Sequence, residues 1–184
     1  MKPDTAKRIF KEAAAILHGT TVSWWLSSGT VLGLIRENMS DAWLQHDTDW
    51  DVSIFGGDNE RQLLLQLFRS AGFMVYRQYD KIGHPVQLCF EKEDVLVDFY
   101  FWRISKTEPD LLICDCEHGQ MIKLSRFGLD RRLEYFNVLD CHVYLPSPVR
   151  EYLFFRYGCD WHVPDGAKTP WNLRCPTLRK HRKD

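Results

Sequence analysis

The sequence predicts an α+β domain, α/β-like in its first half, in which a central mixed β-sheet is flanked by helices. The first observation is the order of segments: helix, strand, helix, strand and helix, followed by antiparallel strands. The second is composition, since 45% of the 184 residues are hydrophobic and 14% are aromatic, enough to bury a core. The third is that no linker interrupts the chain. We therefore expect a single domain over residues 1–184, with a core at about 4–165 and a basic, loop-like tail at 166–184.

The first third of the chain contains two expected helices and a strand. Apolar residues recur at spacings of three and four over 4–18, which predicts an amphipathic helix that Gly19 ends. Residues 22–26 are an apolar run with two tryptophans, typical of a buried strand. The small residues at 27–30 break this strand, and residues 31–37 are expected to form a short helix.

Later elements are predicted from hydrophobic spacing and turn signals. Residues 59–70 have the leucine spacing of an amphipathic helix. Strands are expected at 73–79, 85–91 and 95–102, with further short strands within 120–124 and 133–145. Ser147 followed by Pro148 is typical of a helix start, with the serine as cap and the proline at the first helical position. This last helix should run to Tyr157.

The charge balance and the hydropathy exclude several classes of protein. Lysine and arginine number 24 against 25 aspartates and glutamates, a net charge of −1. Phosphate attraction alone therefore cannot hold a nucleic acid, and we expect no nucleic-acid partner. No apolar run approaches the roughly 20 residues of a membrane helix, so no membrane span is expected. The first residues do not follow the pattern of a signal peptide, which predicts a cytoplasmic protein.

Residues 46–55 are an expected strand in which acidic and apolar side chains alternate. Asp47, Asp49 and Asp51 fall on one face of this strand, and Trp50 falls on the other. Alternate side chains of a strand lie ~7 Å apart, where like charges raise each other's pKa and cost folding energy. Mg²⁺, which binds carboxylate oxygens together with substrate phosphates, would neutralise them. An ordinary solvated sheet face is the alternative interpretation.

Two further features favour a cation site. Asp98 lies within an otherwise apolar predicted strand, where a lone buried aspartate is costly unless it is paired or bound to a metal. The turn Ser28-Gly29-Thr30 opens a helix just before the carboxylate strand, and backbone N–H groups at such a helix start suit phosphate oxygens. Arg36 ends that helix. It either reaches donor phosphates or favours the helix C-terminus, and the sequence does not decide between these interpretations.

These motifs, in this order, resemble the nucleotidyltransferase fold of the DNA polymerase β type. The closer resemblance is to the LicD family of phosphocholine and ribitol-phosphate transferases. It covers about residues 20–165 and rests on an opening motif at 25–36, a metal motif at 46–54, a third carboxylate stretch at 97–100 and a closing segment at 146–161. Ser28 replaces a glycine of the family pattern, and Gln45-His46 replace a Pro-Trp pair. These departures concern the identity of the substrate more than metal binding.

The resemblance implies a metal-dependent transferase. Asp49 and Asp51 match the metal-binding pair of the family, and Asp98 matches its third carboxylate. These three residues would be both the catalytic residues and the ligands of Mg²⁺ or Mn²⁺, while Asp47 would support substrate binding. Asp98 could also accept the proton of an attacking hydroxyl.

The resemblance also implies the substrates. Ser28, Gly29 and Thr30 would contact donor phosphates, with Arg36 as a further candidate. The donor would be a nucleotide-diphosphate-linked compound such as CDP-choline or another CDP-alcohol, the acceptor a sugar hydroxyl of a glycan, and CMP the released product. Two alternatives stay open: a nucleotidyltransferase that moves NMP to a small molecule, RNA or protein, and a degenerate, non-catalytic nucleotide-binding module.

Overall fold

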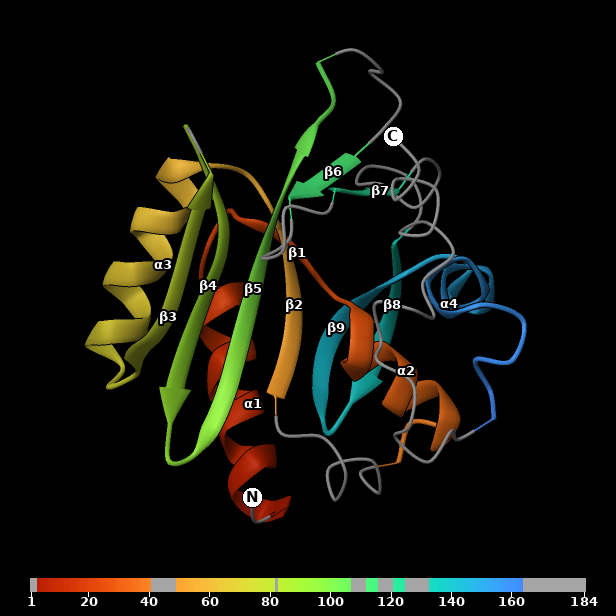
Figure 1. Ribbon diagram of the computed structural model, residues 1–184. Coiled ribbons are helices and arrows are strands. Elements are labelled where there is room, and N and C mark those ends of the chain that lie inside the picture. The colour runs from red at the N-terminus through yellow and green to blue at the C-terminus, as the bar shows by residue number, and fades with distance from the viewer. Residues whose placement is uncertain are drawn as a thin grey trace.

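The computed structural model describes residues 3–40, 49–81, 83–106, 112–115, 121–124 and 133–163. They form a mixed α/β architecture in which a central mixed sheet is flanked by helices (Figure 1), and this confirms the predicted class at that level. In chain order the elements are α1 (Pro3–His18), β1 (Ser23–Leu26), α2 (Ser28–Arg36), β2 (Asp49–Phe55), α3 (Asp58–Ser70), β3 (Met74–Lys81), β4 (His84–Lys92), β5 (Val95–Ile104), β6 (Leu112–Asp115), β7 (Met121–Leu124), β8 (Leu133–Val138), β9 (Cys141–Pro146) and α4 (Val149–Tyr157).

The central sheet has the strand order β1-β2-β5-β4-β3, with β6 paired to β5 and β7 paired to β6. β2 and β5 are parallel, whereas the other described pairs of this sheet are antiparallel. β8 and β9 form a separate antiparallel hairpin. Because β2 and β5 are direct neighbours, alternate side chains of the two strands meet on the same face of the sheet.

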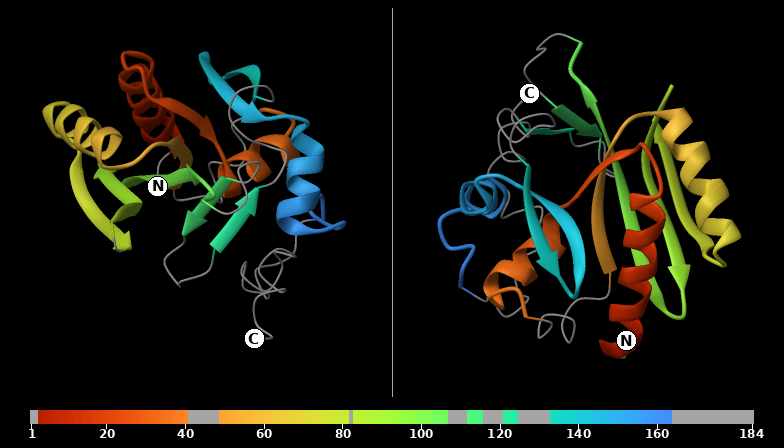
Figure 2. Two further views of the ribbon diagram at one scale, coloured as in Figure 1. Left: turned by 90° about the horizontal axis from the view of Figure 1, so that it is seen from above. Right: turned by 180° about the vertical axis from the view of Figure 1, so that it is seen from behind.

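Helices α1 and α3 cover one face of the sheet (Figure 2). The ring of Phe10 in α1 stacks on Trp50 of β2 with 3.9 Å between centroids. Phe68 of α3 contacts Phe90 of β4 and Phe99 of β5, with centroids 4.8 and 5.0 Å apart. All five rings are buried. Burial of such aromatic area, at roughly 25 cal/mol per Å², makes this face the main apolar core of the protein.

The C-terminal elements return to the beginning of the chain. α2, α4 and the β8–β9 hairpin gather at the β1 end of the sheet (Figures 1 and 2). Trp24 of β1 meets Tyr144 of β9 edge-on, with centroids 6.2 Å apart. Lys11 of α1 pairs with Asp140 in the β8–β9 turn at 3.0 Å. Since α4 packs on both α2 and β9, it lies next to the segment that contains the Ser28-Gly29-Thr30 turn.

Two helices begin at other residues than the sequence predicted. α2 starts at Ser28, three residues early, because the extended residue Ser27 is its N-cap. α4 starts at Val149, so the prediction that Pro148 is the first helical residue with Ser147 as cap is wrong. Pro148 is extended, with φ −70° and ψ 131°, and occupies the cap position itself. The Ser147 hydroxyl instead donates a hydrogen bond to Glu134.

Candidate functional site

Three aspartates converge on the face of the sheet opposite α1 and α3. Asp51 of β2 is in register with Asp98 of β5, and Asp49 precedes Asp51 on the same face. Carboxylate oxygens of all three lie within 4.8 Å of one another. Asp51 is 8% exposed and Asp98 only 1%, so water does little to screen their charges. The parallel pairing of β2 with β5 thus concentrates up to three negative charges in a poorly solvated place.

Asp51 is tied to the start of α2 through both its backbone and its side chain. The Gly29 N–H donates to Asp51 Oδ2 at 2.7 Å, and the Asp51 N–H donates to the Thr30 hydroxyl at 2.8 Å. The Ser27 N–H donates to the Asp51 carbonyl at 3.0 Å. A carboxylate at a helix N-terminus is also stabilised by the helix dipole. The small residues before and within α2 therefore fix where the Asp51 carboxylate points.

Ser28 connects this helix start to the end of the chain. Its N–H donates to the hydroxyl of Tyr152 in α4 at 2.9 Å. Tyr152 is buried, and burial raises the pKa of its hydroxyl above the ordinary range of a tyrosine. Ser28 has φ +46°, a left-handed conformation that favours glycine. A glycine would adopt this conformation without the strain that a serine side chain adds.

The Asp98 carboxylate lies among polar groups of β3 and β4. Gln87 Nε2 donates to Asp98 Oδ1 at 2.9 Å, and a guanidinium nitrogen of Arg77 is 3.5 Å from Asp98 Oδ2. Burial raises the pKa of Asp98, and the charge of Asp49 adds to the rise. A hydrogen bond from Cys89 and the charge of Arg77 oppose it. The carboxylates are thus held together at an electrostatic cost that a bound cation would offset.

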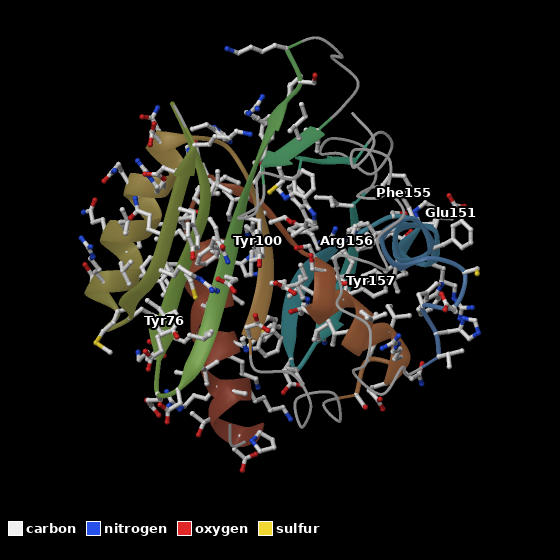
Figure 3. All side chains as sticks on the ribbon, viewed as in Figure 1. Tyr76, Tyr100, Glu151, Phe155, Arg156 and Tyr157 are labelled. Carbon is white, nitrogen blue, oxygen red and sulfur yellow. The ribbon has the colours of Figure 1, made fainter. Side chains whose placement is uncertain are left out.

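Tyr100 continues the carboxylate face along β5 (Figure 3). Its hydroxyl is 3.4 Å from Gln87 Nε2. Burial raises the pKa of Tyr100, and the charges of Asp51, Asp98 and Asp49 raise it further. The phenol therefore stays protonated and is available as a hydrogen-bond donor beside the carboxylates.

Arg36, the last residue of α2, makes contacts that neither of its two interpretations anticipated. Its Nε donates to the carbonyl of Trp161 at 2.6 Å, and its guanidinium also donates to the carbonyl of Val163 at 3.2 Å. These bonds link the end of α2 to the segment after α4. A contact of Arg36 with donor phosphates stays a prediction, as does such a contact for Thr30, which is fully buried against Asp51. Asp47 lies outside the described residues.

Several polar residues of this site were not predicted. Tyr100 alternates with Asp98 along β5, and Gln87 is a polar residue within an apolar strand, so each had a local signal. Arg77 had none, because its contact depends on strand pairing, and Tyr152 lies in the closing motif at 146–161, which gave no indication of its contact with Ser28.

The donor set fits a hard divalent cation. Asp49, Asp51 and Asp98 each offer carboxylate oxygens, the ligand type that Mg²⁺ and Mn²⁺ prefer, and no soft ligand is needed to complete the group. The convergence of three carboxylates whose mutual repulsion is poorly screened is the geometric basis for this fit.

The sequence is similar to that of known phosphotransferases. It is 28% identical over 177 residues to the ribitol-5-phosphate transferases FKTN of Macaca fascicularis and Homo sapiens, covering 92% of this chain and 37% of each relative. The mouse protein of the same name is 28% identical over 175 residues. The chain thus spans little more than a third of the length of these relatives. No family model matches it. The similarity supports the predicted relationship to LicD-like phosphotransferases and supports a transferase.

Within the parts of the chain that the structure describes, no helix is both long enough and apolar enough to cross a membrane.

Proposed function

We propose that the protein is a metal-dependent LicD-like transferase with the nucleotidyltransferase fold, which moves a polyol phosphate from a CDP-linked donor to a sugar hydroxyl of a glycan. The observation that carries the proposal is the convergence of Asp49, Asp51 and Asp98 within 4.8 Å beside the start of α2. Ribitol phosphate is the first candidate for the transferred group, because the relatives are named for it.

The proposed reaction is a phosphoryl transfer. The acceptor hydroxyl oxygen forms a bond to the phosphorus that carries the polyol. The bond from that phosphorus to the bridging oxygen breaks, and CMP leaves with this oxygen. The hydroxyl proton passes to a carboxylate, and Asp98 is the proposed acceptor because it faces the same place as Asp49 and Asp51 from the neighbouring strand.

Phosphoryl transfer depends on positioning and charge neutralisation more than on covalent catalysis. Mg²⁺ or Mn²⁺ held by Asp49, Asp51 and Asp98 would supply neutralisation of the diphosphate and of the leaving CMP. The turn at the start of α2 positions Asp51, which hydrogen-bonds to the Gly29 N–H and to the Thr30 hydroxyl. Ser28, Gly29 and Thr30 are proposed to border the donor phosphates.

A double-labelled donor tests the proposal. CDP-ribitol with tritium in the cytidine and carbon-14 in the ribitol is incubated with Mg²⁺ and a panel of sugar acceptors. We expect carbon-14 to appear on an acceptor while tritium appears in CMP. Tritium on the acceptor would instead support the nucleotidyltransferase alternative, in which NMP is transferred.

Two variants make this experiment specific. Asp49→Asn should stop transfer, whereas Asp94→Asn, an exposed aspartate in the β4–β5 turn, should not. Absence of turnover and of nucleotide binding in the unaltered protein would contradict the proposal and would favour the non-catalytic module.

A further inference from the structure

A buried glutamine of β4 contacts the candidate site. Gln87 is 2% exposed and lies between Val86 and Leu88, which are buried as well. A buried amide is costly unless it is hydrogen-bonded, so its partners indicate why it is there. Gln87 Nε2 donates to Asp98 Oδ1 at 2.9 Å and lies 3.4 Å from the hydroxyl oxygen of Tyr100. The amide of Gln87 is therefore committed to the face of the sheet that contains the carboxylates.

The register of β4 and β5 explains the contact between Gln87 and Asp98. Gln87 is paired with Tyr100 in the antiparallel ladder, so Asp98, two residues along β5, is its diagonal neighbour on the same face. Diagonal neighbours are separated by roughly 7–8 Å, a gap that only long side chains bridge. A glutamine is long enough to reach the carboxylate, whereas an asparagine is one methylene group shorter.

This hydrogen bond fixes the direction of the Asp98 carboxylate. An ionised carboxylate only accepts hydrogen bonds, so the NH₂ group of the Gln87 amide must face it. Because Oδ1 is held, the carboxylate group cannot rotate freely, and the direction of Oδ2 is fixed as well. A carboxylate oxygen has more than one acceptor site, so Oδ1 can keep this bond while the group also binds a cation.

Arg77, the other side chain beside Asp98, is less suited to this task. Its guanidinium nitrogen is 3.5 Å from Asp98 Oδ2, and its side chain is 33% exposed, so the contact is weaker than that of Gln87. A positive charge next to the carboxylate also opposes the binding of a cation. The neutral amide of Gln87 supports the carboxylate without reducing the negative charge that attracts a cation.

We propose that Gln87 is a positioning residue that holds the Asp98 carboxylate in the orientation in which it binds Mg²⁺ or Mn²⁺ together with Asp49 and Asp51. This inference rests on the proposed function. Side chains that hydrogen-bond to metal ligands orient those ligands and thereby set the affinity for the metal. The proposal gives a role in metal binding to a residue of β4, a strand that supplies none of the three carboxylates.

Titration with Mn²⁺, followed by electron paramagnetic resonance, tests the inference because it gives both the affinity and the number of sites per molecule. Gln87→Met keeps the length of the side chain but lacks the donor, and should weaken Mn²⁺ binding about 10- to 100-fold. Gln87→Asn keeps the amide but is too short to reach Asp98, and should lose affinity as well. The number of sites per molecule should stay the same in both variants, since the three carboxylates are still present.

Two control variants separate positioning from general destabilisation. Gln78→Met makes the same substitution at an exposed glutamine of β3, and Leu88→Val removes a methylene group from the buried residue that follows Gln87. Leu88→Val should lower the melting temperature. Neither control should change the affinity for Mn²⁺, because Gln78 and Leu88 are paired with each other and Leu88 with Phe99, on the other face of the sheet.

Unchanged affinity for Mn²⁺ in Gln87→Met would overturn the inference, and so would an equal loss of affinity in Leu88→Val. Fewer sites per molecule at unchanged affinity would show that Gln87 serves folding alone. If Gln87→Met does not fold, as judged by its melting curve, Gln87→Asn decides in its place, and unchanged affinity in that variant would contradict the inference. Failure of the unaltered protein to bind Mn²⁺ would remove the metal site of the proposed function itself. That failure is distinguished from one at Gln87 because it needs no substitution.

Discussion

The two faces of the central sheet are built from the same strands and have opposite chemistry. On the face covered by α1 and α3, β2 and β5 present the buried residues Trp50, Val52 and Phe99, and the rings of Trp50 and Phe99 pack on Phe10 and Phe68. On the other face, one residue away along each strand, they present Asp51 and Asp98. The apolar face supplies stability, whereas the acidic face costs stability because burial desolvates the Asp98 carboxylate and the charge of Asp49 repels it. The comparison teaches that the core holds the strands in a register in which the carboxylates must meet.

Truncation of the apolar face should have the largest effect on stability. Phe99→Ala removes a fully buried ring that contacts Phe68 and Phe90, and should lower the free energy of unfolding by about 3–5 kcal/mol. Urea unfolding followed by circular dichroism measures this change. A loss below about 1 kcal/mol would show that this face is not the main core.

Neutralising an aspartate of the acidic face should abolish activity without lowering stability. Asp49→Asn and Asp51→Asn should each lower transfer at least about 100-fold, because each removes a proposed metal ligand. Neither should lower the free energy of unfolding of the metal-free protein, since like-charge repulsion is relieved. CMP release and urea unfolding are compared with those of Asp94→Asn. Near-normal transfer in either variant would refute the metal assignment.

Removal of the hydrogen bond that links α4 to α2 should lower stability by an intermediate amount. Tyr152→Phe leaves the part-buried N–H of Ser28 without its acceptor, and should cost about 1–3 kcal/mol of stability. Because this N–H adjoins the Gly29 N–H that orients Asp51, transfer by the folded variant should also slow. Tyr135→Phe, which alters a tyrosine that is 58% exposed, is the control. Equal stabilities of the two variants would show that this hydrogen bond does not contribute.

The smallest effect is expected at the left-handed residue of the α2 turn. Ser28→Gly should raise the free energy of unfolding by about 0.5 kcal/mol, since relief of the unfavourable φ of +46° is partly cancelled by the greater freedom of glycine in the unfolded chain. Thermal melting of the two proteins measures it. A clear destabilisation would mean that the serine side chain contributes a contact that outweighs the backbone conformation.

The sequence predicted those features of the fold and site that depend on local patterns. The alternation of acidic and apolar residues around Asp49 and Asp51 identified both faces of β2, because side chains of a strand alternate with a period of two. The predicted start of α4 was wrong, because a Ser-Pro pair is compatible with a helix that begins either at the proline or one residue later. The contact that decides between them, from Ser147 to Glu134, joins distant parts of the chain.

Contacts between segments that are distant in the sequence could not be predicted from local patterns. Asp98 was linked to the other aspartates by its place within an apolar strand and by a family resemblance, and the parallel pairing of β2 with β5 supplies the physical reason. The contact of Ser28 with Tyr152 joins residues 124 positions apart, and no periodicity in either segment predicts it. The burial of Arg156 likewise follows from the packing of α4. The cytoplasmic location stays a prediction.

Direct titration with Mn²⁺, followed by electron paramagnetic resonance, tests most directly whether the three carboxylates form a cation site. The unaltered protein should bind Mn²⁺, Mg²⁺ should compete, and binding should be lost in both Asp49→Asn and Asp98→Asn but kept in Asp94→Asn. These variants are compared at a temperature at which circular dichroism shows each to be folded. Mn²⁺ binding that persists unchanged in Asp49→Asn and Asp98→Asn, or that is absent from the unaltered protein with and without CDP, would contradict the account.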